Sequence, residues 1–342
     1  MTRNIPIIDG HIDLAWNNIA LGRRFEDSVI EKRSKDSVEI VRTEGEATVG
    51  FPEVKNANIR IIFGTIWLET KDSIYPTIGP KFSSIEEARF WADKQFSYYE
   101  ALLQNNGCMF IKNASDVSRV LYSNEYTFSI LPIIEGLEFV ESDCDLQQWV
   151  DRGIRIIAPI WQKNKYGGCS ELGGGLTKEG FSLLQSLQKH KVAIDISHMS
   201  DDAANDVFDT YEGLVINTHT ACRHFVSDTR LISDCQIKKI QERNGVIGLM
   251  TWGDKLKGNL TVEIDDYIDH ICHVANVAGN TDLIGIGSSM DGGYGVASLP
   301  KGMNSIQSLE LLYDAMLRRS FSDKEIEGIL YRNWERILMA IY

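Results

Sequence analysis

Long apolar runs are absent from this sequence. No hydrophobic stretch approaches the roughly 20 residues that a membrane-spanning helix needs. The first residues, MTRNIPIIDGHID, contain no apolar core of a signal peptide, and the final ERILMAIY lacks the apolar tail of a lipid-anchor signal. We therefore expect a cytoplasmic protein with no membrane partner.

Positive charge is also scarce. The 342 residues include 35 Lys and Arg against 48 Asp and Glu, which gives a formal net charge of -13 at pH 7. Proteins that bind a phosphate backbone hold it with clustered Lys and Arg, and this chain shows no such cluster. The charge balance argues against nucleic acid as a partner.

Paired cysteine motifs are the third absence. The six cysteines form no C-x-x-C pair, so the sequence predicts neither a zinc finger nor a dense disulfide framework. We expect free thiols at Cys108, Cys144, Cys169, Cys222, Cys235 and Cys272.

The sequence does contain eight short runs rich in Ile and Val. Near-continuous runs of this kind predict strands covered on both faces, as in a parallel sheet wrapped by helices. Because eight strands close a barrel and such barrels reach this length as one domain, we predict an α/β fold, a single (β/α)8 TIM barrel over residues 1–342. The expected strands are 5–9, 59–67, 129–136, 154–161, 192–198, 213–219, 245–252 and 283–288.

Amphipathic segments between these runs predict helices. Ser233 with Gln236, and Ser322 with Glu325, have the spacing of a capping box. Residues 14–58 are polar and too long for a simple crossover, so we expect an insertion over the barrel mouth. The expected helices include 87–104, 177–190, 200–211, 233–244 and 261–278.

An open, doubly wound sheet is the alternative architecture. Its dinucleotide signature, G-x-G-x-x-G after the first strand, is missing from this chain. The GIGSSM at 285–290 comes late and lacks the third glycine, so it does not support that alternative.

Candidate metal ligands fall at the ends of the expected strands. His11 and Asp13 follow the first strand, Glu135 closes the third, His198 the fifth and His219 the sixth. Because the carboxyl ends of barrel strands surround one pocket, these five side chains are expected to converge. Imidazole and carboxylate ligands suit zinc, while manganese, cobalt and iron stay open alternatives.

The spacing of these ligands favours two ions. Alternate residues of a strand project to the same side, so His11 and Asp13 can reach one ion. Glu135 has two carboxylate oxygens and can bridge ions about 3.5–4 Å apart, the separation of two-metal hydrolytic sites. His198 and His219 would complete the second ion.

The other histidines have different settings. His190, His270 and His273 lie within or at the ends of expected helices, and we assign them to structure or surface. His224 lies in the loop after the sixth strand, which could be near the pocket. A functional contact of His224 is therefore an open alternative.

The motifs resemble those of the membrane (renal) dipeptidase family, peptidase family M19 of the amidohydrolase superfamily, in its short bacterial branch. They run in the family's order over nearly the whole chain. The matching segments are DGHIDLAW at 9–16, IIEGLE at 133–138, AIDISHMS at 193–200, THTACRHFVSDTR at 218–230 and GIGSSMDGG at 285–293.

The resemblance implies roles for these residues. His11, Asp13 and Glu135 would hold one zinc ion, and Glu135, His198 and His219 a second. The two ions would activate a water molecule for attack on a peptide carbonyl. Arg230 matches the family arginine that holds the substrate's free carboxylate, and the alternative is an exposed loop arginine. The resemblance is also compatible with a homodimer.

Two positions depart from the family pattern. Ser289 stands where the family has an aspartate that handles the proton of the attacking water, a function worth roughly 10²–10⁴-fold in rate. Asp291 could substitute for it, although it matches a second family aspartate whose role is structural. After the fourth strand, Trp161 or Gln162 replaces a histidine that polarises the substrate carbonyl, and Gln162 could still donate a hydrogen bond.

The sequence therefore predicts a binuclear zinc-dependent hydrolase of small dipeptides or related amides, with reduced or altered activity. Glu135, Ser289 and Asp291 are the catalytic candidates, and Arg230, Trp161 and Gln162 the substrate-binding candidates. One alternative is a catalytically degenerate barrel that keeps its pocket for binding. Another is an amidohydrolase of a different substrate class, because barrels host many chemistries.

Overall fold

Eight parallel strands close into a barrel in the computed structural model, which describes residues 5–73, 75, 77–105, 108–123, 127–258 and 261–342. The order around the barrel is β1-β10-β9-β8-β7-β6-β5-β2, and β1 pairs with both β10 and β2. The predicted TIM barrel is thereby confirmed. Its strands are β1 (Ile7–Ile12), β2 (Ile59–Trp67), β5 (Ser129–Glu135), β6 (Ile156–Ala158), β7 (Ala193–Asp195), β8 (Val215–Thr220), β9 (Ile247–Leu249) and β10 (Ile284–Ile286).

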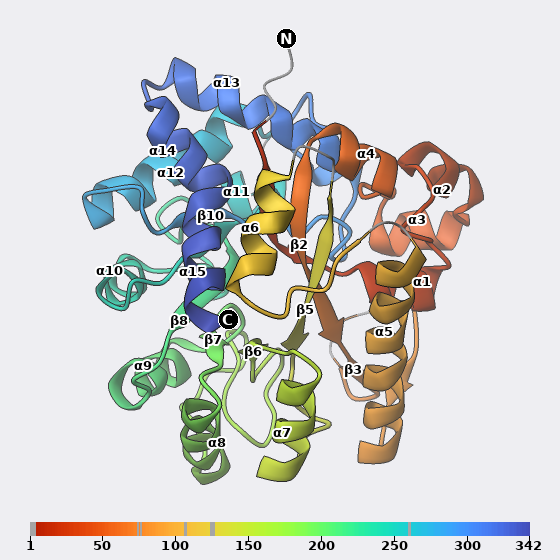
Figure 1. Ribbon diagram of the computed structural model, residues 1–342, viewed down its shortest axis with the longest axis vertical. Helices are drawn as coiled ribbons and strands as arrows, with labels where there is room; N and C mark the ends of the chain where they lie inside the picture. The colour runs from red at the N-terminus through yellow and green to blue at the C-terminus, as the bar shows by residue number, and fades with distance from the viewer. Residues whose placement is uncertain (1–4, 74, 76, 106–107, 124–126, 259–260) are drawn as a thin grey trace.

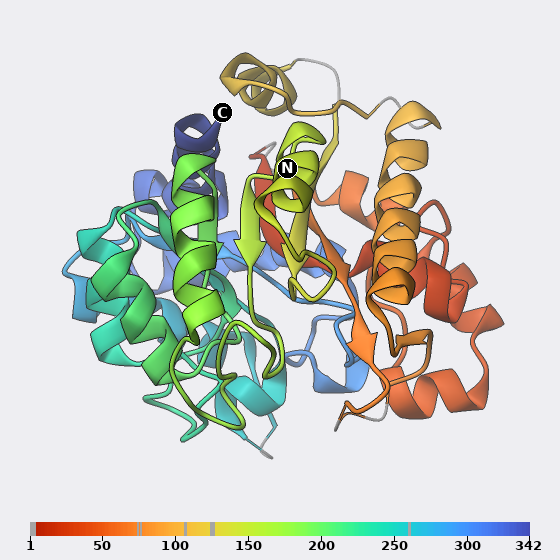
Figure 2. The same ribbon diagram turned by 90° about the horizontal axis from the view of Figure 1, so that it is seen from below.

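Helices surround the strands, as two perpendicular views show (Figure 1, Figure 2). Among the described residues, no helix combines the length and apolarity that crossing a membrane requires. The expected helical segments form α5 (Ile85–Asn105), α8 (Lys178–Lys189), α9 (Asp201–Thr210), α10 (Asp234–Glu242) and α12 (Ile264–Ala278). The remaining outer helices are α6 (Ala114–Tyr122), α7 (Asp143–Asp151), α11 (Gly253–Lys257), α13 (Leu311–Arg318), α14 (Asp323–Glu327) and α15 (Asn333–Ile341), with shorter helical turns at Val296–Ser298, Ile306–Glu310 and Gly328–Arg332.

Both predicted capping boxes are present. The Ser233 hydroxyl accepts from the Gln236 amide N–H, and the Gln236 side chain accepts from the Ser233 amide N–H in return. Ser322 and Glu325 make the same reciprocal pair at the start of α14. Each box satisfies amide groups that the first turn of a helix leaves without a partner.

Four short helices connect β1 to β2. A buried guanidinium holds this segment together: Arg23 bonds Asp36 at 2.8 Å and the Gly45 carbonyl at 2.5 Å. After β2 the chain forms a further small sheet of β3 (Glu69–Thr70) and β4 (Lys81–Phe82), which the sequence did not predict. The four connecting helices are α1 (Leu14–Leu21), α2 (Val29–Lys35), α3 (Val38–Glu44) and α4 (Phe51–Asn56).

The barrel strands are buried along their whole length, as expected for a parallel sheet covered by helices. Trp334 of α15 packs against β1 and β10, where its indole N–H donates to the Ile286 carbonyl at 2.8 Å. A Cβ atom would lie 2.7 Å from Trp334 at Gly10 and 2.4 Å from it at Gly285. Only glycine therefore allows the indole this close to the strands.

Several expected strands end earlier than the sequence suggested, and for the candidate site the important one is the strand before His198. The run 192–198 predicted that His198 closes the strand, but β7 ends at Asp195. The Asp195 carboxylate accepts from the Ser197 amide at 3.0 Å, and the Met199 amide donates to the Ile196 carbonyl at 3.1 Å. These local bonds turn the chain and present His198 from a loop.

His270 of α12 gives the fold a measurable acid sensitivity. Its ring is buried, with Nδ1 accepting from the Cys222 amide at 2.9 Å and Nε2 donating to the Leu256 carbonyl at 3.0 Å. Burial lowers the pKa of His270 from 6.5 to about 4. Between these values the unfolded chain binds the proton and the folded chain does not, so stability is lost as pH falls from 6.5 towards 4.

We expect His270→Gln to remove up to about 3 kcal/mol of the fall in unfolding free energy between pH 7 and pH 4. Urea denaturation at a series of pH values measures this slope. The exposed His224 provides the matched control, His224→Gln. An unchanged slope in His270→Gln would contradict a buried neutral imidazole.

Candidate metal centre

The five expected ligands converge at the carboxyl ends of the barrel strands. His11 lies within β1, Asp13 directly follows it, and Glu135 is the last residue of β5. His198 lies three residues beyond β7, and His219 lies within β8. Four strands that are distant in the sequence therefore supply one cluster.

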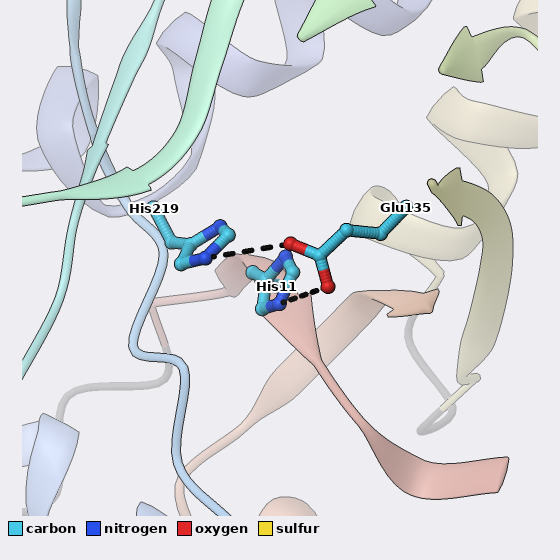
Figure 3. Close-up of side chains that lie close together, drawn as sticks. All are labelled: His11, Glu135 and His219. Carbon is cyan, nitrogen blue, oxygen red and sulfur yellow. Dashed lines mark ion pairs between the residues drawn. The ribbon is translucent and has the colours of Figure 1, made fainter. Parts of the chain in front are cut away.

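The two oxygens of the Glu135 carboxylate face the rings of His11 and His219 (Figure 3). Its Oε2 is 3.7 Å from His11 Nε2, and its Oε1 is 3.6 Å from His219 Nε2. One ligand atom from each of these three residues lies within 4.8 Å of the others. Asp13 approaches from the side, with Oδ2 3.8 Å from His11 Nε2.

His198 completes the group from its loop. Its Nε2 is 2.9 Å from Glu135 Oε1 and 3.0 Å from His219 Nε2. Arg230 Nη2 also lies 3.1 Å from His198 Nε2, and because a guanidinium only donates, this nitrogen presents its lone pair. That orientation explains why Glu135 Oε1, though close to His198, has no hydrogen-bond donor among the described residues.

An outer layer orients His219. The Thr218 hydroxyl donates to Asp195 Oδ2 at 2.5 Å and lies 3.0 Å from His219 Nδ1. With its one hydrogen given to Asp195, the hydroxyl accepts from Nδ1–H, which leaves Nε2 of His219 unprotonated and facing Glu135. Metal-binding histidines are commonly held in this way.

Burial sets the charge of the site. It lowers the pKa of His11 to about 3, with the nearby Arg230 charge adding to the effect. Burial also holds the pKa values of His198 and His219 well below their usual range. All three imidazoles are therefore neutral near pH 7, which is the form that binds a metal ion.

The carboxylates have the opposite shift. Burial raises the pKa of Asp13 to about 6, against a hydrogen bond from Thr65, and burial with the Asp13 charge raises that of Glu135. The neutral imidazole nitrogens and the buried carboxylate oxygens thus face one another, and few hydrogen-bond donors lie between them. This donor set fits divalent metal ions of the zinc, manganese or cobalt type.

A cavity of about 380 Å³ lies over the cluster. Of the other site candidates, Arg230, Trp161 and Ser289 line it. Gln162 and Asp291 do not, and the Gln162 amide donates instead to the Thr70 hydroxyl at 2.8 Å. The carbonyl-polarising role considered for Gln162 stays a prediction without a contact to support it.

Arg230 has a free donor at the cavity. Its Nη2 donates to the His219 carbonyl at 3.1 Å, while Nη1 is buried and has no acceptor among the described residues. A guanidinium nitrogen without a partner can donate to an anion such as a carboxylate.

Asp291 makes the contacts of a structural residue. Its Oδ1 accepts from the Thr48 amide at 2.6 Å and the Thr48 hydroxyl at 2.7 Å, and its Oδ2 accepts from the Val49 amide at 3.2 Å. These bonds fix the segment before α4 beside the turn that follows β10. A proton-transfer role for Asp291 stays a prediction that these contacts do not favour.

We expect Asp291→Ala to lower the free energy of unfolding by about 2–4 kcal/mol, because three donors lose a charged acceptor. Asp291→Asn keeps one oxygen and should cost less. Urea denaturation measures both variants. A stable Asp291→Ala protein that had lost turnover would instead assign Asp291 to catalysis.

Several lining residues were not predicted from the sequence. Trp16, Trp67, Tyr75 and Glu171 belong to segments that read as core or loop, and their approach to the cavity depends on the fold. Asp195 does not line the cavity, but its position on the strand before His198 could have indicated from the sequence that it lies near the ligands.

The family model for membrane dipeptidase, peptidase family M19, matches residues 1–342. The chain belongs to this family. This M19 protein is similar to an uncharacterised Klebsiella pneumoniae protein of the pqqA 5′ region, at 25% identity over 67% of the chain and 88% of that protein. It is 26% identical to human dipeptidase 3 over 49% of the chain, and the match spans about a third (33%) of that relative's length.

Solved structures share the fold of this M19 protein. The metallopeptidase dipeptidase AC superposes with a TM-score of 0.82 at 20% identity, covering 99% of both chains. A Rhodobacter sphaeroides metallopeptidase, liganded with a phosphinate mimic of the dipeptide L-Ala-D-Ala, gives a TM-score of 0.81 at 20% identity and covers 99% of both chains. The barrel architecture is therefore that of M19 metallopeptidases.

Proposed function

We propose that this M19 protein hydrolyses small dipeptides or related amides with two divalent metal ions, zinc first among them. The convergence of His11, Asp13, Glu135, His198 and His219 beneath one cavity carries the proposal. His11 and Asp13 would hold one ion, His198 and His219 would hold the other, and the two oxygens of Glu135 would be shared between them. Bound ions of this kind act as Lewis acids toward a carbonyl and lower the pKa of water.

The chain's own residues orient the substrate. Arg230 binds the terminal carboxylate, for which its unpartnered Nη1 and planar fork are suited. Held at that end, the peptide bond lies over the metal-binding cluster, and the buried surroundings keep bulk water away from it.

Proton transfer is the step of the reaction for which this chain has the fewest suitable side chains. Ser289 lines the cavity at the position of the family's aspartate, and a serine hydroxyl does not act as a carboxylate base near neutral pH. Trp161, which shares with Gln162 the candidacy for the position of the family histidine, lines the cavity and offers one indole N–H instead of an imidazole. We therefore propose turnover below that expected for an M19 site with both family residues.

Metal analysis coupled to a hydrolysis assay tests the proposal. Protein purified without chelator is analysed for metal and assayed with and without zinc on a dipeptide panel that includes L-Ala-D-Ala, the dipeptide mimicked in the Rhodobacter sphaeroides protein. About two metal ions per chain with turnover supports the proposal. No metal after zinc loading contradicts the assigned site.

A binding role without hydrolysis is the second candidate, favoured by Ser289 and Trp161. In that case the protein retains about two metal ions and a ligand-binding cavity but hydrolyses no member of a broad dipeptide and amide panel.

A further inference from the structure

Four aromatic side chains form a continuous wall on one side of the cavity. The Trp67 ring lies 5.4 Å from Trp16 and 4.8 Å from Trp161, and Trp161 lies 5.2 Å from Tyr75, measured between ring centroids. All four residues line the cavity, and the wall reaches the metal-binding cluster at His198, whose ring is 5.9 Å from Trp161. We call Trp16, Trp67, Tyr75 and Trp161 the aromatic wall.

This wall is not an extension of the barrel core. Trp16 and Trp67 pack with Leu21 in a small cluster of their own, against which Trp161 lies partly buried. The Trp67 indole N–H is buried and has no acceptor among the described residues. The wall is therefore a separate apolar cluster that borders the cavity.

The barrel order separates the three tryptophans of the wall from the cationic side of the cavity. Trp16 follows β1, Trp67 ends β2 and Trp161 follows β6, while Arg230 follows β8 and Lys255 follows β9. The metal-binding cluster draws its residues from both arcs and from the loop after β7 between them. A substrate whose carboxylate meets Arg230 and whose amide lies over the cluster therefore directs its other end to the wall.

The two other carboxylates of the cavity already have partners. Glu44 accepts from the Ile78 amide at 2.9 Å, and Glu171 lies near enough to the Tyr75 hydroxyl and to the Arg230 charge for both to feel its negative charge. Neither is left over to pair with a cationic side chain. The faces and edges of the wall can pack against a flat apolar group.

We propose that the aromatic wall is the subsite for a large aromatic side chain on the carbonyl side of the scissile amide, so that the preferred dipeptides have Phe, Tyr or Trp as their N-terminal residue. This inference rests on the proposed dipeptide hydrolysis. It assigns a specificity role to Trp161, which is, with Gln162, one of the two candidates for the position of the family histidine.

Kinetics on matched dipeptides test the subsite. With the zinc-loaded protein we expect kcat/KM for Phe-Gly to exceed that for Ala-Gly by about 10–100-fold, the range for burying one large apolar side chain. Trp161→Ala should reduce that ratio at least about fivefold. Trp91→Ala, a tryptophan of α5 outside the cavity, is the matched control and should keep the ratio. Trp161→Leu and thermal unfolding curves separate loss of the wall from misfolding.

A binding measurement separates the subsite from the reaction. The probe is 6-phenylhexanoate, which spaces its carboxylate and ring by as many atoms as Phe-Gly and has no amide to cleave, compared with hexanoate by calorimetry. Tighter binding of the phenyl compound that Trp161→Ala abolishes supports the subsite, even if no dipeptide is hydrolysed and the proposed reaction fails. Equal rates for Phe-Gly and Ala-Gly, or a preference for Lys-Gly, would overturn the subsite while dipeptide hydrolysis stands.

Discussion

Replacement of Glu135 by glutamine is expected to lower dipeptide hydrolysis by more than about 100-fold, beyond what loss of an outer hydrogen-bond partner costs a metal site. The two oxygens of Glu135 face the Nε2 atoms of His11, His198 and His219. Glutamine removes the negative charge and turns one acceptor into an NH₂ group, whose hydrogens then point toward imidazole lone pairs. Both changes weaken the binding of a divalent cation.

Metal content and kcat/KM are measured together on the Glu135→Gln protein. Glu138→Gln is the matched control, because it makes the same chemical change three residues along the chain, outside the cavity, where the side chain accepts from Asn164 at 3.1 Å. We expect the control to keep its metal. If Glu135→Gln also kept a full complement of metal and its turnover, Glu135 would not be a ligand.

The barrel could be predicted because its strands carry a local signal. Residues 59–67 and 129–136 are short runs rich in Ile, and they form β2 and β5 with bounds that differ by no more than a residue. Helix starts are equally local, as the capping box of Ser233 shows. Strand ends that depend on a side-chain hydrogen bond are harder to predict from the sequence. The turn that ends β7 at Asp195 is an example, because it relies on the hydrogen bond from the Ser197 amide to the Asp195 carboxylate.

The residues of the candidate site likewise divide into those that the sequence could predict and those that it could not. Ligands at strand ends, such as His11 and Glu135, could be found from the sequence because the barrel topology alone brings them together. The Thr218 hydroxyl between Asp195 and His219 could not, since threonine on a strand reads as an ordinary β former. Trp67 likewise reads as the apolar end of a strand, and only the packed structure shows it lining a cavity.

We expect Ser289→Asp to raise kcat/KM for dipeptides by roughly 10²–10⁴-fold, the contribution of a positioned acid or base. Ser289 lines the cavity, and a Cβ at Gly292 would lie 2.9 Å from its Oγ and 3.1 Å from Asp13 Oδ2, so the hydroxyl lies beside the metal-binding cluster. The backbone there has φ 56°, a left-handed conformation that aspartate tolerates better than most residues. The new carboxylate can therefore occupy the site without backbone rearrangement.

Ser289→Asn is the matched control, because it has the size and backbone preference of aspartate but no ionisable group. A gain in kcat/KM with aspartate and none with asparagine identifies proton transfer as the step that limits this chain. If aspartate brings no gain while the metal content is unchanged, the cavity serves another substrate, and the wall around Trp161 becomes the first region in which to look for its recognition.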